Sequence, residues 1–157
     1  MSKTTPATLA LSNAGIAFTL ASYDYDPNAE RVGLQAAEAM GVSPSEVFKT
    51  LMAELDGKPV CAIVPSDEEV NMKKLAAALG GKSAQMMKPA DAERLTGYKV
   101  GGISPLGQRK SVPTVLDELA TLYDEIFLNG GQRGLQIRIR PADLIGAVKC
   151  VVADVVR

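Results

Sequence analysis

The chain has 157 residues, of which 46% are hydrophobic and 22% charged, a composition typical of an ordinary soluble globular protein with a sizeable core. Its 17 basic and 18 acidic side chains leave a net charge of −1, which excludes a global attraction to nucleic acid or to a membrane surface. Histidine is absent, and this excludes every serine or cysteine triad that depends on imidazole.

The length predicts one domain over residues 1–157. The opening MSKTTPATLA lacks the apolar core of a signal peptide, and no apolar run approaches the roughly 18 residues of a membrane span. We therefore expect a cytoplasmic protein with no membrane partner. Cys61 and Cys150 lack CxxC spacing and lie in apolar runs, which favours small buried thiols over a disulfide or metal site. We expect neither a metal nor another cofactor.

The first half of the chain predicts two helices, a strand and a hairpin. Thr5 can cap a first helix, residues 16–20 alternate as a strand does, and GLQAAEAMG reads as a second helix. Residues 47–55 and 58–65 flank an Asp-Gly pair, which supplies the positive dihedrals of a tight hairpin turn.

The second half predicts three further helices and a second hairpin. Helical spacing and caps indicate helices over 71–80, 89–97 and 141–148. An NGG turn joins Ile126 and Leu128 to an alternating strand over 135–140, and CVVADVV predicts a last strand, whereas residues 112–123 fit either a strand or a helix. Because hairpins outnumber strand-helix-strand units, we expect an α+β domain with a mixed, mainly antiparallel twisted sheet flanked by helices.

Residues 96–110, TGYKVGGISPLGQRK, hold four glycines and a proline. This stretch matches neither the dinucleotide-binding fingerprint nor the P-loop pattern. Gly101 and Gly102 could direct two amide N–H groups at an oxyanion, or the stretch could be a tight loop that closes the sheet. We call residues 96–110 the glycine loop.

Two other stretches are candidates for chemistry. Lys49 is a lone charge between Phe48 and Leu51, so its ammonium either reaches solvent with a buried stem or enters a pocket to meet an anion. Residues 129–134, NGGQRG, could hold an anion on open amides and Arg133, or form a plain hairpin turn.

Several motifs, in this order, resemble one family. They are TPA at 5–7, YDYDP at 23–27, FKTL at 48–51, MKKLAAALG at 72–80, the glycine loop, and GGQRGL at 130–135. The chain is similar to the YbaK-type Cys-tRNA(Pro) deacylases, of the superfamily that shares the editing domain of bacterial prolyl-tRNA synthetases. The resemblance covers almost the whole chain and implies that superfamily's barrel-like sheet.

The resemblance implies a trans-editing enzyme that cleaves the aminoacyl ester at the 3′ end of Cys-tRNA(Pro), with the cysteine thiol of the substrate attacking its own carbonyl. Lys49, Gly101 and Gly102 would be catalytic, since ester cleavage needs placement and oxyanion stabilisation more than a strong base. Candidate substrate-binding residues are Tyr23, Ser104, Pro105, Asn129, Gly130, Gly131 and Gln136.

Asn129 and Gln136 depart from the pattern, because relatives carry serine at the first position and an acid or hydroxyl at the second. Deacylation of alanyl-, seryl- or threonyl-tRNA is therefore an alternative, as is a non-catalytic module that binds a synthetase. The resemblance implies aminoacyl-tRNA and prolyl-tRNA synthetase as partners, and we expect no DNA partner. A phosphate-facing patch could comprise Lys73, Lys74, Lys82, Lys88, Arg109, Lys110 and Arg133, although a solvated helix face explains Lys73 and Lys74 equally well.

Overall fold

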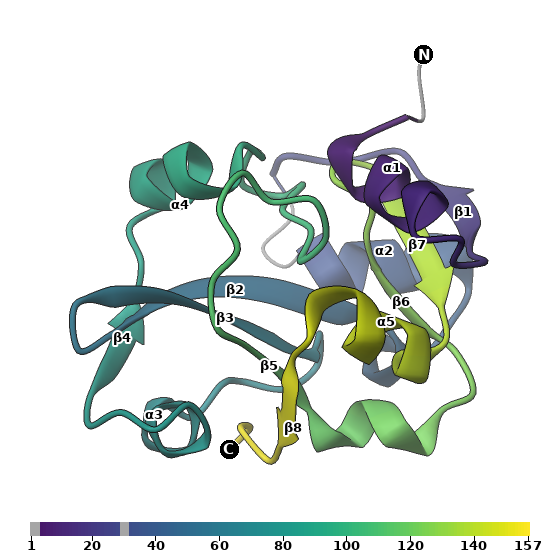
Figure 1. Ribbon diagram of the computed structural model, residues 1–157. Coiled ribbons are helices and arrows are strands. Elements are labelled where there is room, and N and C mark those ends of the chain that lie inside the picture. Colours follow the sequence, from purple (N-terminus) through teal and green to yellow (C-terminus); the bar gives the residue numbers. More distant parts are fainter. Residues whose placement is uncertain (1–3, 29–31) are drawn as a thin grey trace.

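The two longest strands form a hairpin at the centre of the fold (Figure 1). In the computed structural model, which describes residues 4–28 and 32–157, β2 (Phe48–Leu55) and β3 (Lys58–Pro65) pair antiparallel along their whole lengths. Asp56 and Gly57 take φ values of 50° and 83°, the left-handed dihedrals that such a turn requires. The predicted Asp-Gly hairpin is therefore confirmed.

Within the described residues the strands form a three-stranded sheet, β1-β7-β6, and a five-stranded sheet, β4-β2-β3-β5-β8. Most pairs are antiparallel, whereas β5 runs parallel to both of its neighbours. A parallel bridge between Val47 and Phe127 links the two sheets, so they make a mixed, barrel-like arrangement that does not close completely. The remaining strands are β1 (Thr19–Ser22), β4 (Ala84–Met86), β5 (Thr114–Asp117), β6 (Ile126–Asn129), β7 (Leu135–Ile139) and β8 (Val151–Ala153).

The helices lie where the sequence predicts them, and their ends differ from the predicted ones by about two residues at most. Thr5 caps the first helix through a capping box with Thr8, Asn71 accepts hydrogen bonds from the amides of Lys73 and Lys74, and Gly97 ends a later helix in the left-handed conformation. The helices are α1 (Pro6–Asn13), α2 (Val32–Met40), α3 (Met72–Ala78), α4 (Pro89–Thr96) and α5 (Pro141–Val148), with 3₁₀ turns η1 (Pro44–Glu46) and η2 (Glu118–Leu122).

Successive side chains of β3 point to opposite faces of the larger sheet and belong to two different hydrophobic clusters. Cys61 and Ile63 belong to a cluster that includes residues of α4, α5, β6 and β7, while Val60, Ala62 and Val64 pack with residues of α3. Figure 1 shows α4 and α3 on opposite sides of this sheet. The glycine loop, which follows α4, therefore lies across the sheet from α3.

The ambiguous stretch at 112–123 contains both a strand and a helical turn. β5 ends at Asp117, a fully buried residue whose carboxylate accepts hydrogen bonds from the amides of Leu119 (3.0 Å) and Val155 (2.9 Å). The first bond caps η2 and the second fixes the chain after β8, which is shorter than predicted. In the described part of the chain, no helix has the length and apolar character that a membrane crossing requires.

Candidate active site

A cavity of about 370 Å³, which we call the β2 cavity, opens along the first half of β2. The edge strand β4 pairs with β2 only at Ala53–Leu55, so among the described residues no strand pairs with residues 49–52 on that side. Part of α4 and of the glycine loop closes the space instead. The lining residues are Val47, Phe48, Lys49, Thr50, Leu51, Met52, Ser66, Met86, Met87, Pro89, Ala92, Val100, Gly101, Ile103, Asn129 and Gln136.

Four of the sequence-predicted site residues line this cavity: Lys49, Gly101, Asn129 and Gln136. They come from β2, the glycine loop, β6 and β7, so the fold brings together segments up to 87 positions apart in the sequence. Lys49 is half-buried rather than fully exposed to solvent. One cation and one glycine backbone therefore share the same enclosed space.

Gly101 and Gly102 differ in the hydrogen bonding of their amide N–H groups. The N–H of Gly102 donates to the carbonyl of Lys99 at 2.8 Å, so it serves the loop's own turn and does not face a ligand as predicted. The N–H of Gly101 has no acceptor among the residues that the structure describes. Gly101 is thus the one of the pair that has both a place at the cavity and an uncommitted donor.

Gly102 instead allows two segments to approach closely. A Cβ atom at this buried position would lie 2.9 Å from the backbone nitrogen of Arg133 and 3.0 Å from the backbone carbon of Gln132. Because those atoms are backbone, they cannot move aside as a flexible side chain would. The glycine loop therefore packs directly on the 129–134 turn.

Asn129 joins the glycine loop to that turn by hydrogen bonds. Its Oδ1 accepts from the amides of Gly131 (2.7 Å) and Gln132 (3.2 Å), and its Nδ2 donates to the carbonyl of Gly101 (3.1 Å). The Gly130 amide donates to Leu135, 2.9 Å away. These three amides are therefore occupied by the protein itself and are not open to bind an anion, so this part of the turn supports the cavity wall.

Ser104, Pro105, Gly130 and Gly131 lie outside the cavity lining. Ser104 is fully buried, and its Oγ accepts from the Leu106 amide at 3.3 Å. Gly131 has a φ of 91°, and a Cβ there would meet the ring of Tyr98 at 2.8 Å. The structure gives these residues contacts that shape the wall, whereas direct substrate contact stays a prediction.

Three buried polar atoms near the cavity lack a hydrogen-bond partner in the described structure: Thr50 Oγ1, Gln136 Oε1 and Tyr23 Oη. Thr50 and Gln136 line the cavity, whereas the predicted site residue Tyr23 lies outside the lining, with its phenol beside the Gln136 side chain. Burial, reinforced by the nearby Tyr25, raises the pKa of Tyr23, so the phenol stays protonated at neutral pH.

Neither cysteine is placed for nucleophilic chemistry at this cavity. Burial raises the pKa of Cys61 to about 12 and also raises that of Cys150. Both cysteines are free thiols, as the sequence predicts. No group of three or more Cys, Asp or Glu side chains in the described residues is placed to hold a metal ion.

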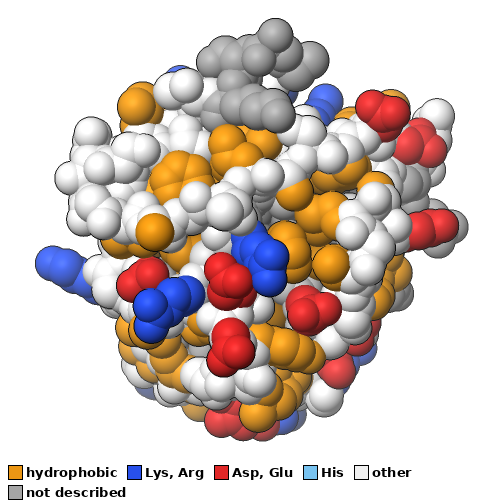
Figure 2. Space-filling model, turned by 90° about the vertical axis from the view of Figure 1, so that its right-hand side faces the viewer, with side chains coloured by type: hydrophobic (Ala, Val, Ile, Leu, Met, Phe, Trp, Pro, Cys, Tyr) orange, Lys and Arg blue, Asp and Glu red, His pale blue; other side chains and the backbone are white. Residues whose placement is uncertain are grey.

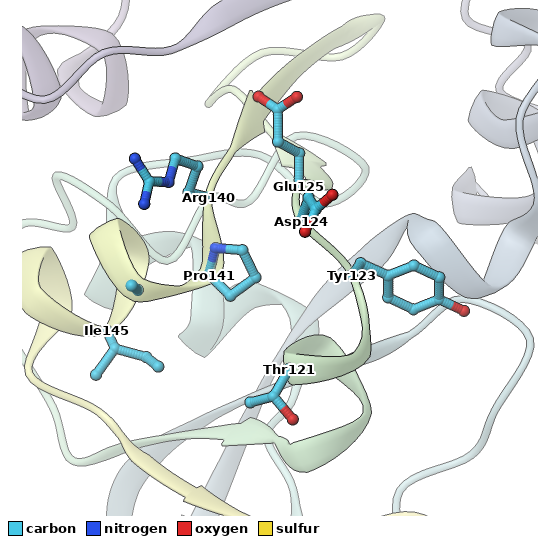
Figure 3. Close-up of a pocket in the computed structure, with 8 residues that line it drawn as sticks. Thr121, Tyr123, Asp124, Glu125, Arg140, Pro141 and Ile145 are labelled. Atoms are coloured by element: carbon cyan, nitrogen blue, oxygen red, sulfur yellow. The ribbon is translucent and has the colours of Figure 1, made fainter.

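A larger and more open cleft, of about 620 Å³, lies between the end of η2 and the start of α5 (Figure 3). It contains none of the predicted site residues. Its lining mixes Arg140 with Asp124 and Glu125, and Tyr123 Oη lies 2.8 Å from Ser45 Oγ in a hydrogen bond. The cleft is therefore separate from the β2 cavity.

The predicted basic residues do not gather into one patch. Lys73 and Lys74 lie on α3, across the larger sheet from α4, and Lys74 pairs with Asp154 at 2.8 Å. On the face shown in Figure 2, acidic and basic side chains are interspersed among hydrophobic ones. Any contact with phosphates must therefore be made locally near the cavity.

Sequence reasoning missed several lining residues. Thr50 is part of the FKTL motif, but only the neighbouring lysine carries an obvious signal. Met86 belongs to β4, a three-residue strand that no alternating pattern indicates. Tyr25, whose hydroxyl would be 2.6 Å from a Cβ on Gly101, stands in the quoted YDYDP motif but was not singled out.

Comparison with known proteins gives a consistent result. Residues 26–147 match the sequence model of the family described as the aminoacyl-tRNA editing domain. A protein of Enterococcus faecalis provisionally named Cys-tRNA(Pro)/Cys-tRNA(Cys) deacylase EbsC is 38% identical over 120 residues, which cover 76% of this chain and 73% of that protein.

Two further proteins are similar over most of the chain. The multifunctional Ser/Thr-tRNA deacylase ProXp-y of Escherichia coli is 27% identical over 140 residues, covering 86% of this chain and 81% of that one. A solved structure provisionally described as a trans-editing enzyme for prolyl-tRNA synthetase superposes with a TM-score of 0.84 at 24% identity, over 97% and 95% of the two chains. The latter similarity shows a shared fold.

Proposed function

The chain belongs to the aminoacyl-tRNA editing domain family, and we propose on this basis that it is a trans-editing deacylase that removes cysteine from mischarged Cys-tRNA(Pro). The relative that is 38% identical carries a name with the same specificity, and adds Cys-tRNA(Cys). The observation that carries the proposal is that Lys49 and Gly101, whose amide is uncommitted, line one cavity.

The cavity suits a small aminoacyl group. Its volume of about 370 Å³ lies at the lower end of the range for small-molecule sites, and most of its lining is apolar. Thr50 and Gln136 contribute polar side chains to this lining, and we place the α-ammonium group of the amino acid beside them. Met52 and Met87 offer a polarizable apolar surface to a thiol side chain.

Cleavage would use the substrate's own thiol. The sulfur attacks the carbonyl carbon, the bond from that carbon to the ribose oxygen breaks, and the thiol proton passes to the ribose hydroxyl, which releases a cyclic thiolactone and free tRNA. Lys49 and the Gly101 N–H would stabilise the oxyanion that forms on the carbonyl. Neither Cys61 nor Cys150 lines the cavity and burial raises the pKa of both, which agrees with a site that supplies no thiol nucleophile of its own.

One observation favours the removal of a different amino acid. The similar Escherichia coli protein is named for Ser/Thr-tRNA, and pockets that differ by a methylene or hydroxyl discriminate by only roughly 10- to 200-fold. We place the selection of tRNA(Pro) with prolyl-tRNA synthetase as a partner, because the face shown in Figure 2 carries no extended basic surface.

A panel of charged tRNAs tests the proposed specificity. We expect the protein to deacylate Cys-tRNA(Pro) at least tenfold faster than Ala-tRNA(Pro) or Ser-tRNA(Pro), measured as kcat/KM with radiolabelled amino acids. Comparison of Cys-tRNA(Pro) with Cys-tRNA(Cys), with and without prolyl-tRNA synthetase, would show where tRNA selection arises. A preference for Ser-tRNA(Pro) or Ala-tRNA(Pro) would show that serine or alanine, rather than cysteine, is the amino acid removed. If no charged tRNA is cleaved, the result would favour a non-catalytic binding module.

A further inference from the structure

Tyr25 and Arg133 form a pair on the outer side of the glycine loop. The guanidinium carbon of Arg133 lies 5.4 Å from the centre of the Tyr25 ring, a cation–π contact. Arg133 Nε also donates to the carbonyl of Val100 at 2.9 Å, which fixes the guanidinium against the loop. The pair is thus held in place rather than left to move freely at the surface.

This pair lies directly beside the cavity. Val100 and Gly101 both line the cavity, and each contacts one member of the pair: Arg133 bonds to Val100, and the Tyr25 hydroxyl lies against Gly101. Val100 is 41% exposed, so an apolar surface continues outward from the cavity to the pair. A group attached to an ester bound at Gly101 would pass over this surface.

The chemistry of the pair suits a nucleotide. A tyrosine ring and a guanidinium plane are the groups on which nucleobases stack, and arginine also binds phosphate through its terminal nitrogens. Arg133 is exposed, and none of its ion pairs or hydrogen bonds within the described residues involves those terminal nitrogens. The Nε of Arg133 therefore fixes the side chain, while its two terminal nitrogens remain to bind a ligand.

We propose that Tyr25 and Arg133 form a subsite for the terminal nucleotide of the acceptor end, with its base on the Tyr25–Arg133 stack and its phosphate on the arginine. This inference rests on the proposed function, because it places the nucleotide next to an ester held at Lys49 and Gly101. The subsite would orient the ester for cleavage through binding energy from a part of the substrate that does not react.

Two substrates that differ in the nucleoside separate this role from support of the loop. Cysteinyl-adenosine carries the base, and cysteine ethyl ester does not. For Tyr25→Leu we expect KM for cysteinyl-adenosine to rise about 5- to 150-fold, since base–aromatic stacking is worth roughly 1–3 kcal/mol. The loss should be confined to the nucleoside substrate, and Tyr25→Phe should recover most of it.

Arg133→Lys and Arg140→Ala extend the test. Arg133→Lys keeps the charge but removes the planar fork, so we expect weaker binding of cysteinyl-adenosine. Arg140 is an exposed arginine in the separate cleft of Figure 3, and its replacement should change neither substrate. An equal loss on both substrates in Tyr25→Leu would reduce the pair to a support for the loop and overturn the proposal, as would no loss on either.

Direct binding distinguishes failure of the subsite from failure of the proposed function. Adenosine 5′-monophosphate should bind the wild-type protein, seen by saturation-transfer NMR, and should lose most of that signal with Tyr25→Leu. If adenosine 5′-monophosphate binds in a manner that depends on Tyr25 but neither ester is cleaved, the deacylase function is wrong and the nucleotide subsite is supported. Absence of this binding in the wild-type protein would overturn the subsite even where both esters are cleaved.

Discussion

Replacing Lys49 by alanine is expected to lower kcat/KM for charged tRNA by about 10²- to 10³-fold, the usual loss when one donor to a developing oxyanion is removed. Lys49 lines the β2 cavity with Gly101, and no other lysine or arginine does so among the described residues. The hairpin that carries Lys49 keeps its backbone pairing with Val64, so the far-ultraviolet circular dichroism and melting temperature should change little. Single-turnover deacylation of Cys-tRNA(Pro) measures the effect.

Lys58 provides a matched control for this substitution. It lies on the same hairpin, is exposed, and is absent from the cavity lining. Lys58→Ala should retain wild-type deacylation, while Lys49→Arg should recover only part of the activity, because a planar guanidinium does not reproduce a compact ammonium. Equal activity of Lys49→Ala and Lys58→Ala would show that Lys49 has no role in the reaction.

Gly102→Ala is expected to reduce both stability and activity. Its methyl group would lie within 3.0 Å of the backbone of Gln132 and Arg133, and such overpacking costs about 1–3 kcal/mol of unfolding free energy. Displacing the loop from the turn also moves Gly101, so we expect deacylation to fall about 10²-fold, as misplacements of about 1 Å can cause. Urea unfolding and steady-state kinetics measure the two effects.

Gly146 is the control for this second substitution. It lies in α5, a Cβ there would meet no atom within 4 Å, and its φ is outside the positive range. Gly146→Ala should stabilise the protein by about 0.5–1 kcal/mol through helix propensity and leave the reaction unchanged. A Gly102→Ala protein with unaltered unfolding and kinetics would contradict the close packing of loop and turn.

Local signals predict much of this fold because they act over a few residues. The Asp-Gly turn, the Thr5 and Asn71 caps and the alternation of Leu135, Ile137 and Ile139 each specify their element without help from distant segments. The β5–η2 boundary could not be predicted in this way. It depends on Asp117 accepting hydrogen bonds from Leu119 and, across the fold, from Val155.

The candidate site likewise has features that local sequence predicts and features that depend on the folded path of the chain. Sequence patterns and resemblance single out Lys49, Gly101, Asn129 and Gln136, and the fold places all four around one cavity. The patterns do not reveal which amides are already occupied. Whether the Gly102 N–H is free depends on the turn with Lys99, and this depends on the three-dimensional path of the loop.

We propose that the bound amino acid breaks its own ester bond while the protein supplies placement and charge. The most direct measurement compares tRNA(Pro) charged with cysteine and with 2-aminobutyrate, which has a methyl group of similar size in place of the thiol and therefore lacks the nucleophile. We expect cleavage of the 2-aminobutyryl ester to fall to the uncatalysed rate, and the thiolactone to appear by mass spectrometry with the cysteinyl ester. Undiminished cleavage of the 2-aminobutyryl ester, with free amino acid as the first product, would contradict thiol attack and assign the attack to water.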